Sequence, residues 1–184
     1  MSPHNQMTPE ETAILPAGVR LIALTTHSDR RGDLTEIFRN EWCDSPLPVQ
    51  WLVSRTGPNI LRGVHVHMRN WDYVCVIAGE VTVGLHDLRT KRSAILHLSA
   101  ERLQVLVIPP GVAHGFYSPA PSTLLLGAST YYDPSDHPAC RWDSPELGLD
   151  WPCSAPELSA NDRDASSYSD FMAALRIDAE CALS

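Results

Sequence analysis

Three histidines and an aspartate lie in two short blocks, and these residue types can either move protons or bind a metal ion. His65 and His67 stand two residues apart in the first block, and Asp72 follows them. His114 ends the second block, 109–114, which reads PPGVAH. Side chains at positions i and i+2 point to the same face of a β-strand. The spacing therefore predicts two imidazoles on one strand face, where a carboxylate and a further imidazole from other strands can join them.

The segments that must position these residues are short and apolar, and turn signals rich in glycine and proline separate them. This pattern predicts about ten strands of an all-β domain. The polar stretch 28–33 is expected to be a turn. The paired blocks resemble those of a cupin, a jelly roll or double-stranded β-helix barrel. The expected strands are 19–24, 34–38, 49–54, 60–65, 73–77, 81–87, 94–98, 105–108, 115–117 and 123–128.

The end of the chain changes character, because Phe171, Leu175 and Cys181 recur at helical spacing after a possible cap at Ser169 or Asp170. We expect one short C-terminal helix that packs on the barrel. The predicted parts are a flexible N-terminal arm (1–16), the cupin β-barrel (17–165) and the helix (166–184).

Composition limits the classes of function. A chain of 184 residues with a net charge of −8 is expected to be one domain that binds neither nucleic acid nor an anionic membrane non-specifically. The apolar run 105–108 is too short to cross a bilayer, and residues 1–11 lack a signal peptide's pattern. Five cysteines without a C-x-x-C spacing indicate neither a disulfide framework nor a thiolate zinc site. We therefore expect a cytoplasmic protein.

Further segments, in order along residues 19–162, resemble the nucleotide-sugar epimerases of the dTDP-4-dehydrorhamnose 3,5-epimerase family. Seven such strings in the family's order are far more specific than any single one. They are 61–65 (LRGVH), 79–81 (GEV), 98–101 (LSAE), 108–116 (IPPGVAHGF), 131–134 (YYDP), 147–152 (LGLDWP) and 158–162 (LSAND).

The resemblance implies proton exchange at a carbon next to the 4-keto group of a nucleoside-diphosphate 6-deoxyhexose, a reaction of deoxysugar biosynthesis. His65 matches the family's catalytic base, and Asp162 matches the carboxylate that orients this base. The resemblance also implies a homodimer formed partly by exchange of N-terminal strands, and it implies no cofactor. The residues that match substrate contacts are Arg31, Glu36, Gln50, Arg62, His114 and Tyr132.

Two positions depart from the family's pattern. Leu126 stands where the family carries a catalytic tyrosine, so this chain lacks the usual proton donor on the opposite face of the sugar. Asp72 stands where the family carries a lysine, so a cation is replaced by an anion. These departures favour a single-site epimerase acting at C3, or a ketoisomerase, over a complete 3,5-epimerase.

Two other classes of function stay open. His65, His67, Asp72 and His114 form the set of three imidazoles and one carboxylate with which metal cupins bind Fe, Mn, Ni or Zn. A metal-dependent enzyme would use His65 as a ligand, and the imidazole would then lose the lone pair that a base needs. The third class is a catalytically silent module that only binds a nucleotide sugar.

Three further histidines of the domain carry no partner pattern. His86, His97 and His137 stand apart from the two blocks, and we expect them at the surface.

Overall fold

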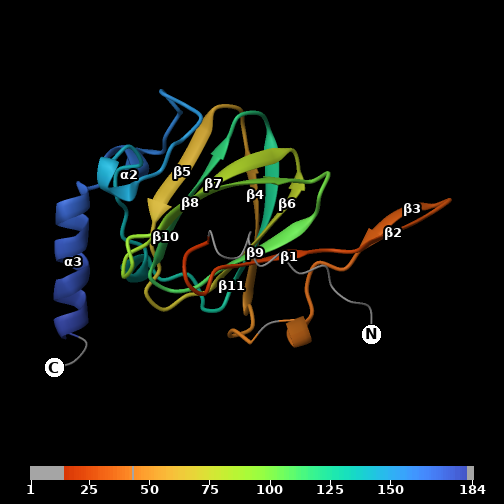
Figure 1. Ribbon diagram of the computed structural model, residues 1–184, viewed down its shortest axis with the longest axis horizontal. Coiled ribbons are helices and arrows are strands. Elements are labelled where there is room, and N and C mark those ends of the chain that lie inside the picture. The colour runs from red at the N-terminus through yellow and green to blue at the C-terminus, as the bar shows by residue number, and fades with distance from the viewer. Residues whose placement is uncertain (1–14, 43, 182–184) are drawn as a thin grey trace.

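A computed structural model describes residues 15–42 and 44–181, and its body is built from two antiparallel sheets that enclose one apolar core (Figure 1). The first sheet has the strand order β1-β9-β6-β11-β4 and the second β5-β10-β7-β8, while β2 and β3 form a separate pair. The expected all-β jelly roll is confirmed. The strands are β1 (Arg20–Ala23), β2 (Thr26–Asp29), β3 (Gly32–Thr35), β4 (Gln50–Thr56), β5 (Ile60–His65), β6 (Asp72–Ala78), β7 (Glu80–Asp87), β8 (Ser93–Ser99), β9 (Gln104–Ile108), β10 (Val112–Ser118) and β11 (Ser122–Ala128).

The core between the sheets follows from strand alternation. Val81, Val83 and Leu85 occupy alternate positions of β7 and pack against Val74 and Val76 of β6. All five side chains are almost completely buried. Burial of one such side chain stabilises the fold by about 1.5–3 kcal/mol. This core holds the two sheets together and fixes the positions of the strands that carry the histidines.

The outer face of β7 is covered by the C-terminal segment, so this strand is buried on both faces. A Cβ atom on Gly84 would lie 2.6 Å from a ring carbon of Trp151, so only glycine admits the indole. His86 is fully buried, with Nδ1 3.1 Å from the carbonyl oxygen of Leu147 and Nε2 3.0 Å from the hydroxyl oxygen of Tyr168. The expected surface position of His86 is wrong, because residues distant in sequence cover it. His97 is exposed, as expected.

The β2–β3 hairpin projects away from the barrel (Figure 1). The stretch 28–33, expected to be only a turn, forms the ends of both strands and the tip between them. A hydrogen bond of 2.8 Å joins the hydroxyl groups of Thr26 and Thr35 across the pair, and Gly32 adopts a φ of 126°. Apolar alternation could not reveal these strands, because β2 is exposed along its whole length.

The expected C-terminal helix is α3 (Tyr168–Cys181), which packs on the outside of the four-stranded sheet through Phe171 and Leu175 (Figure 1). Its cap is Ser167 rather than Ser169 or Asp170, since the Ser167 hydroxyl oxygen accepts the Asp170 N–H at 3.3 Å. The expected arm 1–16 lies mostly outside the described residues. No helix in the described ranges is long and apolar enough to span a membrane.

The part of the expected barrel domain that follows β11 contains no further strand within the described residues. It consists of loops and short helical turns that run back along the barrel. One of these turns carries Asp162. The short elements of the chain are η1 (Asn40–Trp42), η2 (Pro134–Asp136), η3 (Pro145–Leu147) and α2 (Ala160–Arg163).

Candidate active site

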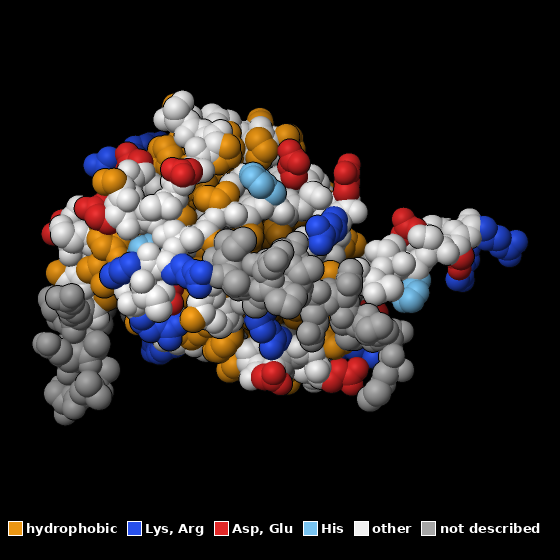
Figure 2. All heavy atoms as spheres, viewed as in Figure 1, with side chains coloured by type: hydrophobic (Ala, Val, Ile, Leu, Met, Phe, Trp, Pro, Cys, Tyr) orange, Lys and Arg blue, Asp and Glu red, His pale blue; other side chains and the backbone are white. Residues whose placement is uncertain are grey.

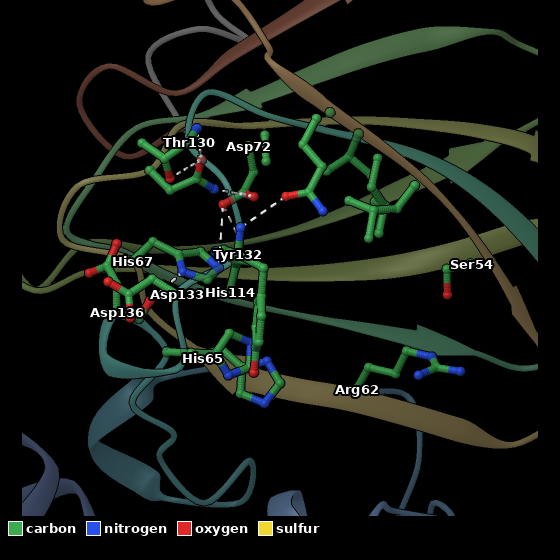
Figure 3. Close-up of a pocket in the computed structure, with 18 of the residues that line it drawn as sticks. Ser54, Arg62, His65, His67, Asp72, His114, Thr130, Tyr132, Asp133 and Asp136 are labelled. Atoms are coloured by element: carbon green, nitrogen blue, oxygen red, sulfur yellow. Dashed lines mark hydrogen bonds and ion pairs between the residues drawn. The ribbon is translucent and has the colours of Figure 1, made fainter.

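A cavity of about 410 Å³ opens between the two sheets, a volume within the range of small-molecule sites. Side chains from β4, β6 and β11 line one side, and side chains from β5 and β10 line the other. The loop 130–137 and helix α2 complete the wall. Figure 3 shows His65, His67, His114 and Asp72 gathered in the cavity, with Arg62 at its side.

His65 and Asp162 form a close pair at the wall of this cavity. His65 Nε2 lies 2.5 Å from Asp162 Oδ1, and the His65 side chain is 18% exposed. Ser159 holds the carboxylate, because its hydroxyl donates to Asp162 Oδ2 at 2.9 Å and accepts the Asp162 N–H at 3.1 Å. Burial alone would raise the pKa of Asp162, but the hydrogen bond and charge of His65 outweigh it and lower that pKa. The carboxylate therefore stays ionised and orients the imidazole.

His137 lies beside this pair, so its expected surface position is wrong. Its ring centroid is 4.1 Å from that of His65 and 5.1 Å from that of His67. Burial, together with the nearby charges of His65 and His67, lowers the pKa of His137 to about 4. The neutral ring faces the cavity from the loop after β11. No local signal in the sequence marks His137, because only the fold of this loop brings it to His65.

His67, Asp72 and His114 form a second group in the same cavity. The Nε2 atoms of His67 and His114 lie 3.8 and 3.7 Å from Asp72 Oδ2. Burial raises the pKa of Asp72 to about 6, and burial also lowers the pKa of His114 to about 3. The possible metal-ligand atoms of these three side chains all lie within 4.8 Å of one another, and among the described residues His65 is not part of this group. In the alternative four-residue metal set, His65 therefore stands apart, since its Nε2 atom is held by Asp162.

A family model for dTDP-4-dehydrorhamnose 3,5-epimerase matches residues 12–170 of this chain. The chain belongs to this epimerase family. The resemblance inferred from the sequence is thereby confirmed, and the family is one of enzymes that act as epimerases.

Relatives within the epimerase family include the dTDP-4-dehydrorhamnose 3,5-epimerase of Pseudomonas aeruginosa. It is 34% identical over 156 residues, covering 77% of this chain and 86% of the relative. The epimerase of the same name from Neisseria gonorrhoeae is 31% identical over 157 residues and 78% of this chain. This chain spans only 48% of the length of that protein.

Solved structures of family members have the same fold. The RmlC epimerase of Mycobacterium tuberculosis superimposes with a TM-score of 0.80 at 26% identity, covering 85% of this chain and 87% of the other. ChmJ of Streptomyces bikiniensis, a 3'-monoepimerase in complex with dTDP-quinovose, gives 0.78 at 26% identity, with 88% and 87% covered. An RmlC from Legionella pneumophila in complex with dTDP-4-keto-L-rhamnose gives 0.75 at 28% identity, with 81% and 87% covered.

Four of the residues that match the family's substrate contacts line the cavity. They are Gln50, Arg62, His114 and Tyr132. The Gln50 side-chain oxygen accepts the Tyr132 N–H at 2.9 Å, which ties β4 to the loop after β11. Arg62 Nε donates to the Thr56 hydroxyl at 3.0 Å and leaves the rest of the guanidinium exposed.

The other two matched residues lie outside the cavity of the single chain. Arg31 is at the tip of the β2–β3 hairpin, where basic side chains are visible in Figure 2, and it pairs with Asp29 at 2.5 Å. Glu36 follows the hairpin and pairs with Arg39 at 2.6 Å. The six residues that match substrate contacts in the sequence are therefore not all brought together by the fold of one chain.

The two departures from the epimerase family lie inside the cavity. Leu126 of β11 presents an apolar side chain to it, and Asp72 lies at the start of β6. Arg62 is the only lysine or arginine among the described lining residues, which include four aspartates. The single-chain cavity therefore offers one permanent positive charge to an anionic ligand.

Proposed function

We propose that this protein is an epimerase or isomerase that acts on a nucleoside-diphosphate 4-keto-6-deoxyhexose, in deoxysugar biosynthesis. The observation that carries the proposal is the hydrogen bond between His65 and Asp162 at the wall of an open cavity. Relatives that bind dTDP-sugars support the substrate class. The free thiols of Cys75, Cys140 and Cys153 fit the cytoplasm, where we place the enzyme.

His65 acts as the base in the proposed reaction. It removes a proton from the carbon next to the keto group, the C–H electron pair forms the C=C bond of the enolate, and the keto oxygen takes the negative charge. Asp162 fixes the tautomer of His65 and stabilises the imidazolium that forms. Arg62 lies where its guanidinium can donate to the enolate oxygen, and His114, whose Nδ1–H is held by the Val112 carbonyl, can contact the sugar through Nε2 as an acceptor. Protonation of the carbon then ends the reaction without any net transfer of electrons, so no redox cofactor takes part.

The apolar side chain of Leu126 favours reaction at one carbon. Inversion requires a proton from the face opposite to the base, and a leucine cannot deliver it. We propose that C3 alone is epimerised, with water as the proton donor on the opposite face, or that the protein is a ketoisomerase. In the ketoisomerase, His65 returns the proton to C4 while the proton of the C3 hydroxyl passes to the C4 oxygen, so that C3 becomes the carbonyl carbon. Epimerisation at a single carbon has a precedent in the 3'-monoepimerase ChmJ.

A homodimer would complete the site. β4 is an edge strand that exposes Trp51 and Val53 to 44% and 52%, and such edges need cover. Arg31 and Glu36 lie outside the cavity of their own chain, while a diphosphate needs more positive charge than Arg62 provides. We propose that the projecting hairpin carries both residues to the cavity of the partner subunit.

The test is incorporation of deuterium from heavy water into dTDP-4-keto-6-deoxyglucose, followed by NMR. We expect exchange at C3 in the wild type and none in His65→Ala. Exposed His97 gives a matched control, and His97→Ala should exchange at the wild-type rate. Ligand binding by calorimetry without exchange at any time point would instead support a catalytically silent binding module.

A further inference from the structure

Three side chains point their nitrogen or oxygen atoms toward the same part of the cavity (Figure 3). These are His67, Asp72 and His114, whose possible ligand atoms all lie within 4.8 Å of one another. The two distances from imidazole Nε2 to Asp72 Oδ2, 3.8 and 3.7 Å, are too long for hydrogen bonds. The three groups therefore surround a shared space and do not form direct hydrogen bonds with one another.

Backbone carbonyl groups determine the tautomers of both imidazoles. His67 Nδ1 lies 2.6 Å from the carbonyl oxygen of Asp136, and His114 Nδ1 lies 3.1 Å from that of Val112. Since a carbonyl oxygen can only accept, both Nδ1 atoms carry a proton, which leaves Nε2 as the atom of each ring that can offer a lone pair. Imidazoles that bind metals are typically held in this way, by an N–H donated to a carbonyl group on the other side.

The Asp72 carboxylate is also held in one orientation by hydrogen bonds. Asp72 Oδ1 accepts a hydrogen bond of 2.8 Å from the Asn70 side-chain nitrogen. The Asn70 amide cannot turn over freely, because its oxygen accepts the backbone N–H of Thr130 at 3.1 Å. Asp72 Oδ2 is consequently left to face the two imidazoles.

We propose that His67, Asp72 and His114 bind one divalent transition-metal ion, at a site separate from His65 and Asp162. Two imidazoles and one carboxylate form a donor set used for Zn(II) and Fe(II), with coordination positions left for water or substrate. When bound, the ion supplies a positive charge to the cavity. The site differs from the alternative four-residue set because His65 is not a ligand and remains available as a base.

Burial and access both suit such a site. The side chains of His67, Asp72 and His114 are 17%, 19% and 7% exposed, so bulk water screens them little. They also line the open cavity, which gives an ion a route of entry. Metal binding rests on these three residues, and it does not depend on whether the cavity catalyses epimerisation.

The test uses the full chain after treatment with a chelator. Titration with Co(II), followed by visible absorption, and with Zn(II), followed by calorimetry, should give one ion per chain. Mg(II) should not bind in the same concentration range, because it prefers oxygen ligands. Asp72→Asn and His67→Gln should each weaken Zn(II) binding by about 100-fold or more. Loss of a residue that only hydrogen-bonds to a metal ligand already lowers metal affinity by about 10–100-fold, and loss of a ligand should cost at least as much. His97→Gln and His65→Gln should keep the wild-type affinity.

A measurement on the wild type complements the variants, in case one of them fails to fold. Pulsed electron paramagnetic resonance of the protein loaded with Cu(II) should count two bound imidazoles. The proposed site would be overturned if the folded wild type bound less than one ion per chain. It would also be overturned if the number of bound imidazoles differed from two, or if His65→Gln weakened metal binding as much as His67→Gln. Metal binding without deuterium exchange would refute only the epimerase proposal, and exchange without metal binding would refute only the metal site.

Discussion

His65 Nε2 lies 2.5 Å from Asp162 Oδ1, although 97 residues separate the two in the chain. β5 ends at His65 in the four-stranded sheet, and α2 brings Asp162 to the same wall of the cavity. Ser159 connects to both the backbone and the carboxylate of Asp162, so the acid is held before any ligand arrives. The two side chains are therefore already in place, as the proposed proton transfer requires.

Asp162→Asn should slow deuterium exchange by roughly 10²- to 10⁴-fold, the usual contribution of positioned acid–base groups. An amide can still contact His65, but it cannot stabilise the imidazolium. The rate of exchange at saturating substrate measures the effect. Asp150→Asn is the control, because Asp150 is exposed and outside the cavity. An Asp162→Asn protein with the wild-type rate would show that His65 does not need the carboxylate.

The same pair should make stability depend on pH. Because the pKa of Asp162 is lowered from its ordinary value of 3.8, ionised Asp162 stabilises the fold above that value. This contribution is lost as the pH falls through the folded-state pKa. Asp162→Asn should therefore unfold at lower urea concentration than the wild type near pH 7, and the difference should shrink below about pH 4. A difference that stays constant over this range would contradict the assigned ionisation.

Leu126→Tyr should extend the reaction to a second carbon of the sugar. A tyrosine at this cavity position can supply the proton that leucine cannot, so we expect deuterium at C5 in addition to C3. Leu126→Phe is the control, since it adds the ring without the hydroxyl group. NMR of the product after reaction in heavy water distinguishes the two carbons. Exchange at C5 in the wild type would instead mean that another group already delivers this proton.

A mixture of two inactive variants tests whether Arg31 acts in the partner subunit. We expect Arg31→Ala and His65→Ala each to be impaired alone. Random reassembly of equal amounts should restore about a quarter of the wild-type sites, because each mixed dimer regains one intact site. Sedimentation of the mixture verifies that dimers form. If Arg31 serves only its own chain, mixing will restore no activity.

The sequence by itself determined the features that depend on neighbouring residues. Short apolar runs between turn signals predicted most strands of the barrel, and helical spacing predicted α3, because both signals lie within a few neighbouring residues. Seven strings in order along 19–162, which include the blocks around His65 and His114, indicated the family. Strand β2 was missed because its exposed side chains carry no such periodicity, and the strand expected at 34–38 overlaps only the end of β3.

Tertiary structure alone decided where His86 and His137 lie. His86 and His137 looked alike as isolated residues, yet one is buried beneath the C-terminal segment and the other faces His65. The contact of His65 with Asp162 removed it from the group formed by His67, Asp72 and His114. These distinctions depend on sheet order and on loops that join distant parts of the chain. Such long-range contacts leave no local periodicity, so only the folded arrangement separates the pair of His65 and Asp162 from the group of His67, Asp72 and His114.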